Sequence, residues 1–179
     1  MSPHHLRILM VDDHPVVLAG LKALVGADPD FAIVGEARDG RTALRLAMQL
    51  NPDVVVLDIS LPEMNGIELA AALRTERPEC RLLVLTVHEE RAYLRQLLEL
   101  GVGGYLLKRS AADELSRAIR AVAAGGMYLD PAIAGKVVGG SAVAAASPSR
   151  ASRSSSPIAR QVCCAWSPVA IATRQFPDA

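Results

Sequence analysis

Several features that define whole classes of protein are scarce or missing in this sequence. Aromatic residues make up 3% of the 179 residues, and the three cysteines include no Cys-x-x-Cys spacing. The sequence therefore offers neither a disulfide framework nor a zinc site of that kind. No apolar run approaches the ~18–20 residues that cross a bilayer, and the apolar stretch near the N-terminus is shorter than the roughly 7–15 residues of a signal-peptide core. We expect a cytoplasmic protein that makes no membrane contact.

The balanced net charge hides a difference between the two ends of the chain. Residues 140–179 contain four arginines and one acid, so the first 139 residues contain 15 basic and 18 acidic side chains. Proteins that bind nucleic acid usually present a wide basic face, which an acidic main body does not provide. We therefore expect no specific DNA binding from this chain.

Short apolar runs alternate with helix-length segments over the first 125 residues. Two of the runs are continuously apolar, which is typical of parallel strands buried on both faces, and the longer segments have apolar residues at three- and four-residue spacing. We expect strands at 6–11, 31–37, 53–57, 81–86 and 104–107, and helices at 15–25, 41–50, 67–77, 89–100 and 112–124. Five such units predict a doubly wound α/β fold, in which right-handed crossovers place helices on both faces of a five-stranded parallel sheet.

The composition changes after Gly125-Gly126. Residues 127–138 have a pattern that fits a strand-like piece and a short helix, within a segment, 126–144, that we interpret as a linker. From residue 139 onward Ser, Ala, Pro and Arg dominate, and no period of 2 or 3.6 residues is visible. This composition predicts a disordered tail at 145–179.

Polar side chains stand where the expected strands end. Asp12 and Asp13 follow the first strand, Asp58 follows the third, Thr86 ends the fourth and Lys108 follows the fifth. A single Asp after a strand is commonly a turn or helix-cap residue, but in an open parallel sheet all these ends meet at one edge, where ligands bind. Clustered carboxylates repel one another unless a cation is present, and such hard oxygen ligands suit Mg²⁺. Together these side chains favour phosphoryl chemistry with an Asp nucleophile.

Four motifs in this order resemble the receiver domain of bacterial response regulators. They are I-L-M-V-D-D at 8–13, V-V-V-L-D followed by L-P-E-M-N-G at 54–66, L-T at 85–86 and G-Y-L-L-K at 104–108. The motifs D-D-H-P-V-V-L-A-G-L and G-G-x-Y-L-D-P are similar to those of the NarL/FixJ branch of response regulators. The resemblance covers residues 5–125 and implies a flavodoxin-like sheet with the strand order 2-1-3-4-5.

Carried over position by position, the resemblance implies a phosphorylation site. Asp58 would accept a phosphoryl group from a sensor histidine kinase. Mg²⁺ would be held by Asp12, Asp13, Asp58 and the backbone carbonyl of Ser60. The protein would catalyse no reaction beyond the phosphorylation and dephosphorylation of its own Asp58.

The same resemblance implies how the phosphoryl group acts on the fold. Lys108 would pair with the acyl phosphate, Thr86 would move towards it, and Tyr105 matches the aromatic residue that turns inward when that threonine moves. Ser60 and His88 would flank the phosphoryl group and influence how long it survives. The affected surface, formed by the fourth helix, fifth strand and fifth helix, is a candidate homodimer face.

Other residues with reactive or metal-binding side chains receive a structural interpretation. His14 precedes Pro15, and we interpret it as a helix-start residue rather than a metal ligand. Cys80 precedes a strand and is interpreted as a structural thiol. The adjacent Cys163 and Cys164 are too close together for the usual spacing of metal ligands.

The chain departs from the family pattern where a LuxR-type helix-turn-helix would begin, near residue 145. The residues after 144 show no recognition-helix pattern. When the reading frame is shifted by one base, the codons of 162–173 can encode V-L-R-L-V-A-G-G-Y-S-N, which resembles the opening of a LuxR-type helix-turn-helix. We interpret 145–179 as a frameshifted remnant of that output domain, with a native low-complexity tail as the alternative.

A second function class also uses an Asp nucleophile with Mg²⁺. Phosphatase-type hydrolases need a general acid near the nucleophile, commonly an Asp two residues later. Position 60 is Ser, so the sequence favours the phosphorylatable switch over the hydrolase.

Overall fold

The described part of the protein contains a single parallel β-sheet covered by helices. The structure is a computed structural model and describes residues 5–138. The strands are β1 (Leu6–Val11), β2 (Phe31–Ala37), β3 (Val54–Leu57), β4 (Arg81–Thr86), β5 (Gly104–Leu107) and β6 (Tyr128–Leu129). They are arranged in the order β2-β1-β3-β4-β5-β6, and all five pairings are parallel. The predicted α/β fold and the order of its first five strands are confirmed, and a short sixth strand extends the sheet.

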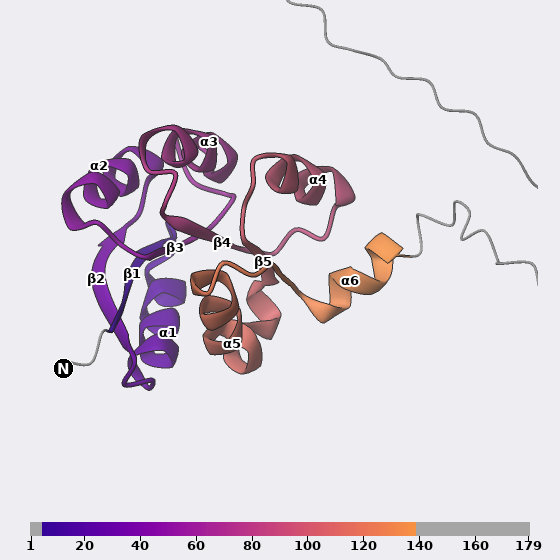
Figure 1. The fold of residues 1–179 in the computed structure, drawn as a ribbon, viewed down its shortest axis with the longest axis horizontal. Helices are drawn as coiled ribbons and strands as arrows, with labels where there is room; N and C mark the ends of the chain where they lie inside the picture. Colours follow the sequence, from indigo (N-terminus) through magenta and orange to yellow (C-terminus); the bar gives the residue numbers. More distant parts are fainter. Residues whose placement is uncertain (1–4, 139–179) are drawn as a thin grey trace, which may run out of the picture. The chain divides into compact units, whose positions relative to one another are not determined.

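Helices cover both faces of the sheet. They are α1 (Pro15–Gly26), α2 (Gly40–Leu50), α3 (Gly66–Glu76), α4 (Arg91–Glu99), the 3₁₀ turn η1 (Lys108–Ser110), α5 (Ala111–Ala123) and α6 (Pro131–Val138). Figure 1 shows α1 and α5 on one face, and α2, α3 and α4 on the other. Within the described residues, no helix is long and apolar enough to span a membrane.

The alternation of side chains along each strand divides the core into two layers. In β1, Leu9 and Val11 pack with the layer under α2, α3 and α4, whereas Ile8 and Met10 pack with the layer under α1 and α5. All four side chains are at most 2% exposed. Successive residues of a strand point to opposite faces, so a strand covered on both sides must be apolar throughout. This requirement accounts for the continuous apolar runs in the sequence.

The segment after Gly126 differs from the linker that the sequence suggested. Tyr128 and Leu129 form β6 and pair with β5, as the strand-like pattern there allows. Asp130 is 1% exposed, and its carboxylate accepts hydrogen bonds from the backbone N–H groups of Leu107 (3.1 Å) and Ala132 (2.8 Å). A buried carboxylate is tolerated when donors satisfy it. Asp130 therefore joins the end of β5 to the start of α6, and this segment is part of the sheet-bearing unit. Residues 139–144 of the expected linker and the expected tail at 145–179 lie outside the described residues.

The loop after β3 leads tightly into α3. The side chain of Asn65 accepts hydrogen bonds from the backbone N–H groups of Ile67 and Glu68, and the Glu68 carboxylate accepts one from the Asn65 N–H. This reciprocal cap satisfies amide donors at the start of the helix. The adjacent Gly66 lies against the strand end: a Cβ atom there would be 2.2 Å from the Asp58 carbonyl oxygen and 2.7 Å from the Ile59 Cα atom. Only glycine fits this approach.

We expect Gly66→Ala to destabilise the fold by roughly 1–3 kcal/mol, because the added methyl group meets backbone atoms that cannot rotate away. Urea unfolding followed by circular dichroism measures this. Gly20→Ala is the matched control: a Cβ at Gly20, inside α1, has nothing within 4 Å, and replacing a helical glycine there should stabilise by about 0.5–1 kcal/mol. Equal unfolding midpoints for the two variants would contradict the tight approach at Gly66.

Candidate functional site

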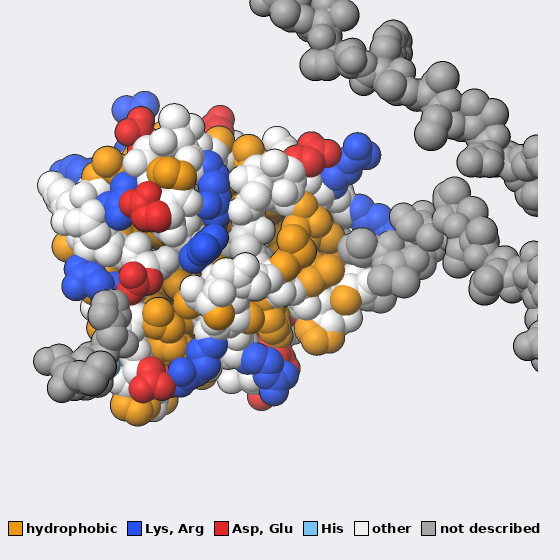
Figure 2. Space-filling model, viewed as in Figure 1, with side chains coloured by type: hydrophobic (Ala, Val, Ile, Leu, Met, Phe, Trp, Pro, Cys, Tyr) orange, Lys and Arg blue, Asp and Glu red, His pale blue; other side chains and the backbone are white. Residues whose placement is uncertain are grey.

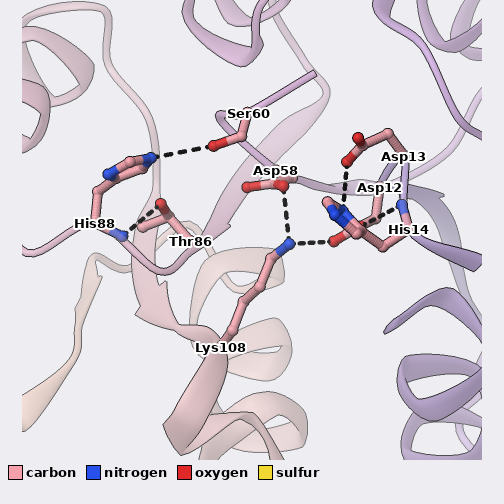
Figure 3. A network of polar contacts seen from close by, with 8 residues as sticks. All are labelled: Asp12, Asp13, His14, Asp58, Ser60, Thr86, His88 and Lys108. Carbon is pink, nitrogen blue, oxygen red and sulfur yellow. Dashed lines mark hydrogen bonds and ion pairs between the residues drawn. The ribbon is translucent and has the colours of Figure 1, made fainter. Parts of the chain in front are cut away.

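Three carboxylates meet at the carboxyl edge of the sheet. Asp12 follows β1 and Asp58 follows the neighbouring β3, and these residues are 1% and 2% exposed. Asp13 is partly exposed beside them. Ligand atoms of Asp12, Asp13, His14 and Asp58 all lie within 4.8 Å of one another, as Figure 3 shows. The structure thus brings together the acids that the sequence placed at two separate strand ends.

Lys108 reaches into this group from the end of β5. Its Nζ atom is 2.6 Å from Asp12 Oδ2 and 2.8 Å from Asp58 Oδ2. Burial alone would lower the pKa of Lys108, but the contacts with Asp12 and Asp58 outweigh burial, and the pKa lies above its usual value. The ammonium group therefore stays charged and bridges two carboxylates.

One lysine does not balance three carboxylates. Asp13 Oδ1 and Asp58 Oδ1 are buried atoms that make no hydrogen bond in the part of the chain that the structure describes, although His14 Nδ1 lies 2.7 Å from Asp13 Oδ1. Buried oxygens of this kind are costly unless a donor or a cation satisfies them. The donor set is made of carboxylate oxygens, which are the preferred ligands of Mg²⁺. The residues at this edge therefore fit a divalent cation.

His88 connects the loops on the other side of Asp58. Its backbone N–H donates to Thr86 Oγ1 at 3.0 Å, its Nε2 atom lies 3.1 Å from Ser60 Oγ, and its carbonyl accepts a hydrogen bond from the Tyr105 hydroxyl at 2.7 Å. The imidazole also lies against the ring of Tyr93 on α4, with 5.2 Å between the ring centroids. The structure therefore brings Ser60, Thr86 and Tyr105 into contact with one residue, His88, as Figure 3 shows for the first two.

Tyr105 already points into the protein in this structure. Its side chain is 1% exposed, and burial, followed by the charges of Glu90 and Glu89, raises the pKa of its hydroxyl to about 12. Thr86 meanwhile accepts a hydrogen bond from the His88 N–H. The inward position of Tyr105 thus does not require Thr86 to leave His88, which refines the expectation that the two residues move together.

His14 is the residue whose side chain was least expected at this site. It is the N-cap of α1, in agreement with the helix-start interpretation, but its side chain makes no capping hydrogen bond. The Nδ1 atom instead lies 2.7 Å from Asp13 Oδ1 and 3.4 Å from Asp12 Oδ1. In the sequence, its position directly after two acids pointed to this site. The Pro15 that follows favoured the interpretation as a helix-start residue instead.

Cys80 behaves as the structural thiol that the sequence suggested. Its side chain is 2% exposed in the core, and burial raises the pKa of the thiol to about 11. The thiol therefore stays protonated at neutral pH, and the thiolate that reacts with electrophiles is scarce. Cys163 and Cys164 lie outside the described residues.

Comparison with known proteins shows the family of this chain. The family model of the response regulator receiver domain matches residues 8–120, which is more than half of the chain. The chain belongs to this family. Asp12, Asp13, Asp58, Thr86 and Lys108 all lie within the matched residues.

Similar proteins place this receiver among LuxR- and NarL-type regulators. The transcriptional regulatory protein LiaR of Bacillus subtilis is 39% identical over 135 residues, covering 74% of this chain and 63% of LiaR. The nitrate/nitrite response regulator NarL of Escherichia coli is 38% identical over 126 residues, covering 70% of this chain and 58% of NarL. The resemblance to this branch is confirmed. The matched part is thus well short of the full length of either regulator.

Solved structures show the same fold. A crystal structure of a LuxR-family two-component response regulator from an Aurantimonas species superimposes with a TM-score of 0.73 at 38% identity, covering 76% of this chain and 97% of that one. The signal receiver domain of a NarL regulator from Mycobacterium tuberculosis gives a TM-score of 0.66 at 36% identity, covering 69% of this chain and 99% of that domain. This chain thus aligns with nearly the full length of both solved structures.

Proposed function

We propose that this receiver accepts a phosphoryl group on Asp58 from a sensor histidine kinase, with Mg²⁺ bound at the acidic edge, and so acts as a switch in a phosphorelay. The observation that carries the proposal is Asp58 Oδ1, a buried carboxylate oxygen without a hydrogen-bond partner in the described chain. The other oxygen, Oδ2, accepts a hydrogen bond from Lys108. One oxygen is therefore oriented by a cationic partner while the other is free to act as a nucleophile.

In the proposed transfer, Asp58 Oδ1 attacks the phosphorus atom of the kinase phosphohistidine. The new P–O bond forms as the P–N bond breaks, and the imidazole of the kinase leaves with the electron pair of that bond. Asp12, Asp13, Asp58 and the Ser60 backbone carbonyl would hold Mg²⁺, which when bound neutralises charge on the phosphoryl oxygens.

Two further side chains are placed to bind the product. Lys108 already contacts Asp58, so its ammonium group can form an ion pair with a phosphoryl oxygen of the acyl phosphate. The Thr86 hydroxyl can donate to another oxygen after giving up its contact with the His88 N–H. Because His88 also contacts Ser60 and Tyr105, a shift of His88 after the loss of this hydrogen bond would reach the loop before α4 and the Tyr105 side chain. A local change in charge thus reaches α4 and β5.

We propose that the protein is not a hydrolase of phosphate esters. The hydroxyl of Ser60 occupies the position where phosphatase-type enzymes commonly have a carboxylic acid, and a serine hydroxyl is too weak an acid to protonate a leaving group. In this structure that hydroxyl contacts His88 Nε2 at 3.1 Å. The proposed chemistry is therefore limited to the phosphorylation and slow dephosphorylation of Asp58.

The proposed homodimer would use the face of α4, β5 and α5. The side of α4 carries a shallow groove lined by Leu94, Leu98 and the side chains of Arg91, Arg95 and Glu99. Figure 2 shows apolar side chains gathered on this part of the surface. An apolar strip bordered by charged side chains is typical of protein contact surfaces. Tyr105 on β5 lies buried beneath this face, and its contact with His88 links the face to the proposed phosphorylation site.

Intact-mass spectrometry of the full chain tests the proposed function. After incubation with acetyl phosphate and Mg²⁺, we expect the protein to gain the mass of one phosphoryl group, which mild alkali removes, as is typical of an acyl phosphate. Omitting Mg²⁺ should strongly reduce the gain. An unchanged mass would contradict the proposal, and rapid turnover of phosphate esters without retained phosphate would favour a hydrolase.

The output of the protein remains a prediction that concerns residues 145–179, outside the described part. We propose that they are a frameshifted remnant of a helix-turn-helix domain and bind no specific operator. Sequencing the gene between the codons for Gly139 and Ser156 tests this. If no single insertion or deletion there opens a frame for a helix-turn-helix, or if this chain gives a footprint on a specific operator, the interpretation is wrong.

Thr86→Ala is expected to separate phosphorylation from the response of the fold. The variant keeps Asp58 and Lys108, so it should still gain one phosphoryl group, but it lacks the hydroxyl that contacts the His88 N–H. Hydrogen exchange over residues 89–108 should therefore change on phosphorylation in the wild type and not in the variant. Thr75→Ala, on the exposed side of α3, is the control that should respond normally. A normal response in Thr86→Ala would remove this hydroxyl from the switch.

A further inference from the structure

The imidazole of His14 lies on the acidic group formed by Asp12, Asp13 and Asp58 (Figure 3). The backbone N–H of His14 donates to Asp12 Oδ1 at 2.9 Å, which holds the residue beside the end of β1. The side chain makes no capping hydrogen bond to α1, and Pro15 directly after it has no N–H to be capped. The ring is therefore not explained by its place at the start of the helix.

The ring nitrogen and the carboxylate oxygens have the spacing of ligands on one ion. Nδ1 lies 2.7 Å from Asp13 Oδ1 and 3.4 Å from Asp12 Oδ1. The 2.7 Å contact with Asp13 has the length of an ion pair. Neighbouring ligands on an octahedral ion with bonds of about 2.1 Å are about 3.0 Å apart. The ring nitrogen and the carboxylate oxygens are thus close enough together to bind one cation.

The acids next to the ring supply a second observation that points to an ion. Asp12 and Asp58 are 1% and 2% exposed, and Asp58 Oδ1 is buried without a hydrogen-bond partner among the described residues. Among the described residues, Lys108 contacts the Oδ2 atoms of both. Asp13 Oδ1, beside His14, is not contacted by Lys108 and is placed to bind a cation together with the ring.

We propose that His14 Nδ1 is an additional ligand of this site, and that the receiver consequently favours first-row transition ions such as Mn²⁺ over Mg²⁺ more strongly than an all-oxygen site does. Mg²⁺ is a hard ion that prefers oxygen and dehydrates reluctantly, whereas an imidazole nitrogen suits the transition ions from Mn²⁺ to Zn²⁺. This inference rests on the proposed function, because it assigns the class of ion used at the same acidic edge.

A purely electrostatic role for His14 makes the opposite prediction. If the ring only paired with Asp13 and Asp12, it would occupy the place of the cation, and its removal would strengthen the binding of every divalent ion. If the ring is a ligand, its removal weakens Mn²⁺ binding and changes Mg²⁺ binding much less. The two roles therefore differ in the sign of one measured quantity.

Manganese titrations followed by electron paramagnetic resonance test the proposal on the full chain. We expect His14→Gln to lower the ratio of Mn²⁺ to Mg²⁺ affinity by about tenfold or more, since even the loss of an outer hydrogen-bond partner of a ligand commonly costs 10–100-fold. Pulsed measurements on bound Mn²⁺ should show coupling to a directly bound nitrogen in the wild type and lose it in His14→Gln. His88→Ala should retain that coupling, and Asp13→Ala should abolish the high-affinity Mn²⁺ signal.

The outcomes are separable from those of the proposed function. Absence of nitrogen coupling in the wild type, an unchanged affinity ratio, or stronger Mn²⁺ binding by His14→Gln would overturn the role of His14 as a ligand. None of these results depends on phosphate transfer, which is measured separately as the mass gained by Asp58 with Mg²⁺. A wild type that shows nitrogen coupling but gains no phosphoryl mass would leave the ligand role intact and overturn the phosphorylation.

Discussion

Replacing Asp58 by Asn is expected to abolish phosphorylation by acetyl phosphate while leaving the fold intact. The amide has nearly the shape of the carboxylate but is not a nucleophile, so no acyl phosphate can form. The substitution removes the negative charge from the buried group that carries the proposed function. Intact-mass spectrometry with Mg²⁺ present should show full labelling of the wild type and none of Asp58→Asn.

The same variant should be more stable than the wild type in buffer without divalent ions. Asp58 shares the buried edge with Asp12 and Asp13, and Lys108 supplies one positive charge against the three carboxylates. Removing one negative charge relieves their repulsion, and functional sites commonly sacrifice stability in this way. Urea unfolding without Mg²⁺ measures the change.

An exposed carboxylate serves as the control for both measurements. Asp113 lies on the surface of α5, and Asp113→Asn should be labelled as the wild type is and should unfold at a similar urea concentration. Labelling of Asp58→Asn at the wild-type rate would show that another residue accepts the phosphoryl group. A marked loss of stability in Asp58→Asn would show that the carboxylate is satisfied in the absence of a cation.

Replacing Asp13 by Ala is expected to weaken Mg²⁺ binding far more than replacing Ser60 by Ala. Asp13 Oδ1 is a buried carboxylate oxygen without a hydrogen-bond partner in the described chain, so its removal deletes a charged ligand. Ser60 would contribute its backbone carbonyl, which the substitution leaves in place, and its hydroxyl instead contacts His88. We expect a loss of affinity of about tenfold or more for Asp13→Ala, as commonly follows from changes around a metal site, and little change for Ser60→Ala.

Isothermal titration calorimetry with MgCl₂ measures both affinities directly. Thermal unfolding provides an independent readout, because an ion that binds only the folded state raises the melting temperature. This rise should be present in the wild type and in Ser60→Ala and absent in Asp13→Ala. Equal losses of affinity in the two variants would contradict the proposed set of ligands.

The arrangement of strands and helices could be predicted because it depends on local patterns of apolar residues. The expected ranges for β1, β2, β4 and β5 agree with the structure. The expected helix at 89–100 begins later, at Arg91, because residues before it are engaged elsewhere: the His88 carbonyl accepts the Tyr105 hydroxyl, and Glu89 forms an ion pair with Arg109. Contacts with distant residues override the local pattern at this helix start.

The sequence by itself determined that acids and Lys108 meet at one edge, because carboxyl ends of parallel strands must lie together once the strand order is known. Only the tertiary structure decided how their side chains are used. It shows Lys108 bridging Asp12 and Asp58, and His14 turned from the helix towards the acids. A side chain takes its direction from neighbours that are distant in sequence, and charge repulsion or attraction among buried groups depends on separations of a few ångströms. The spacing of residues in the sequence places the acids and Lys108 at the carboxyl edge of the sheet, whereas the packing of the fold decides which side-chain atoms contact one another there.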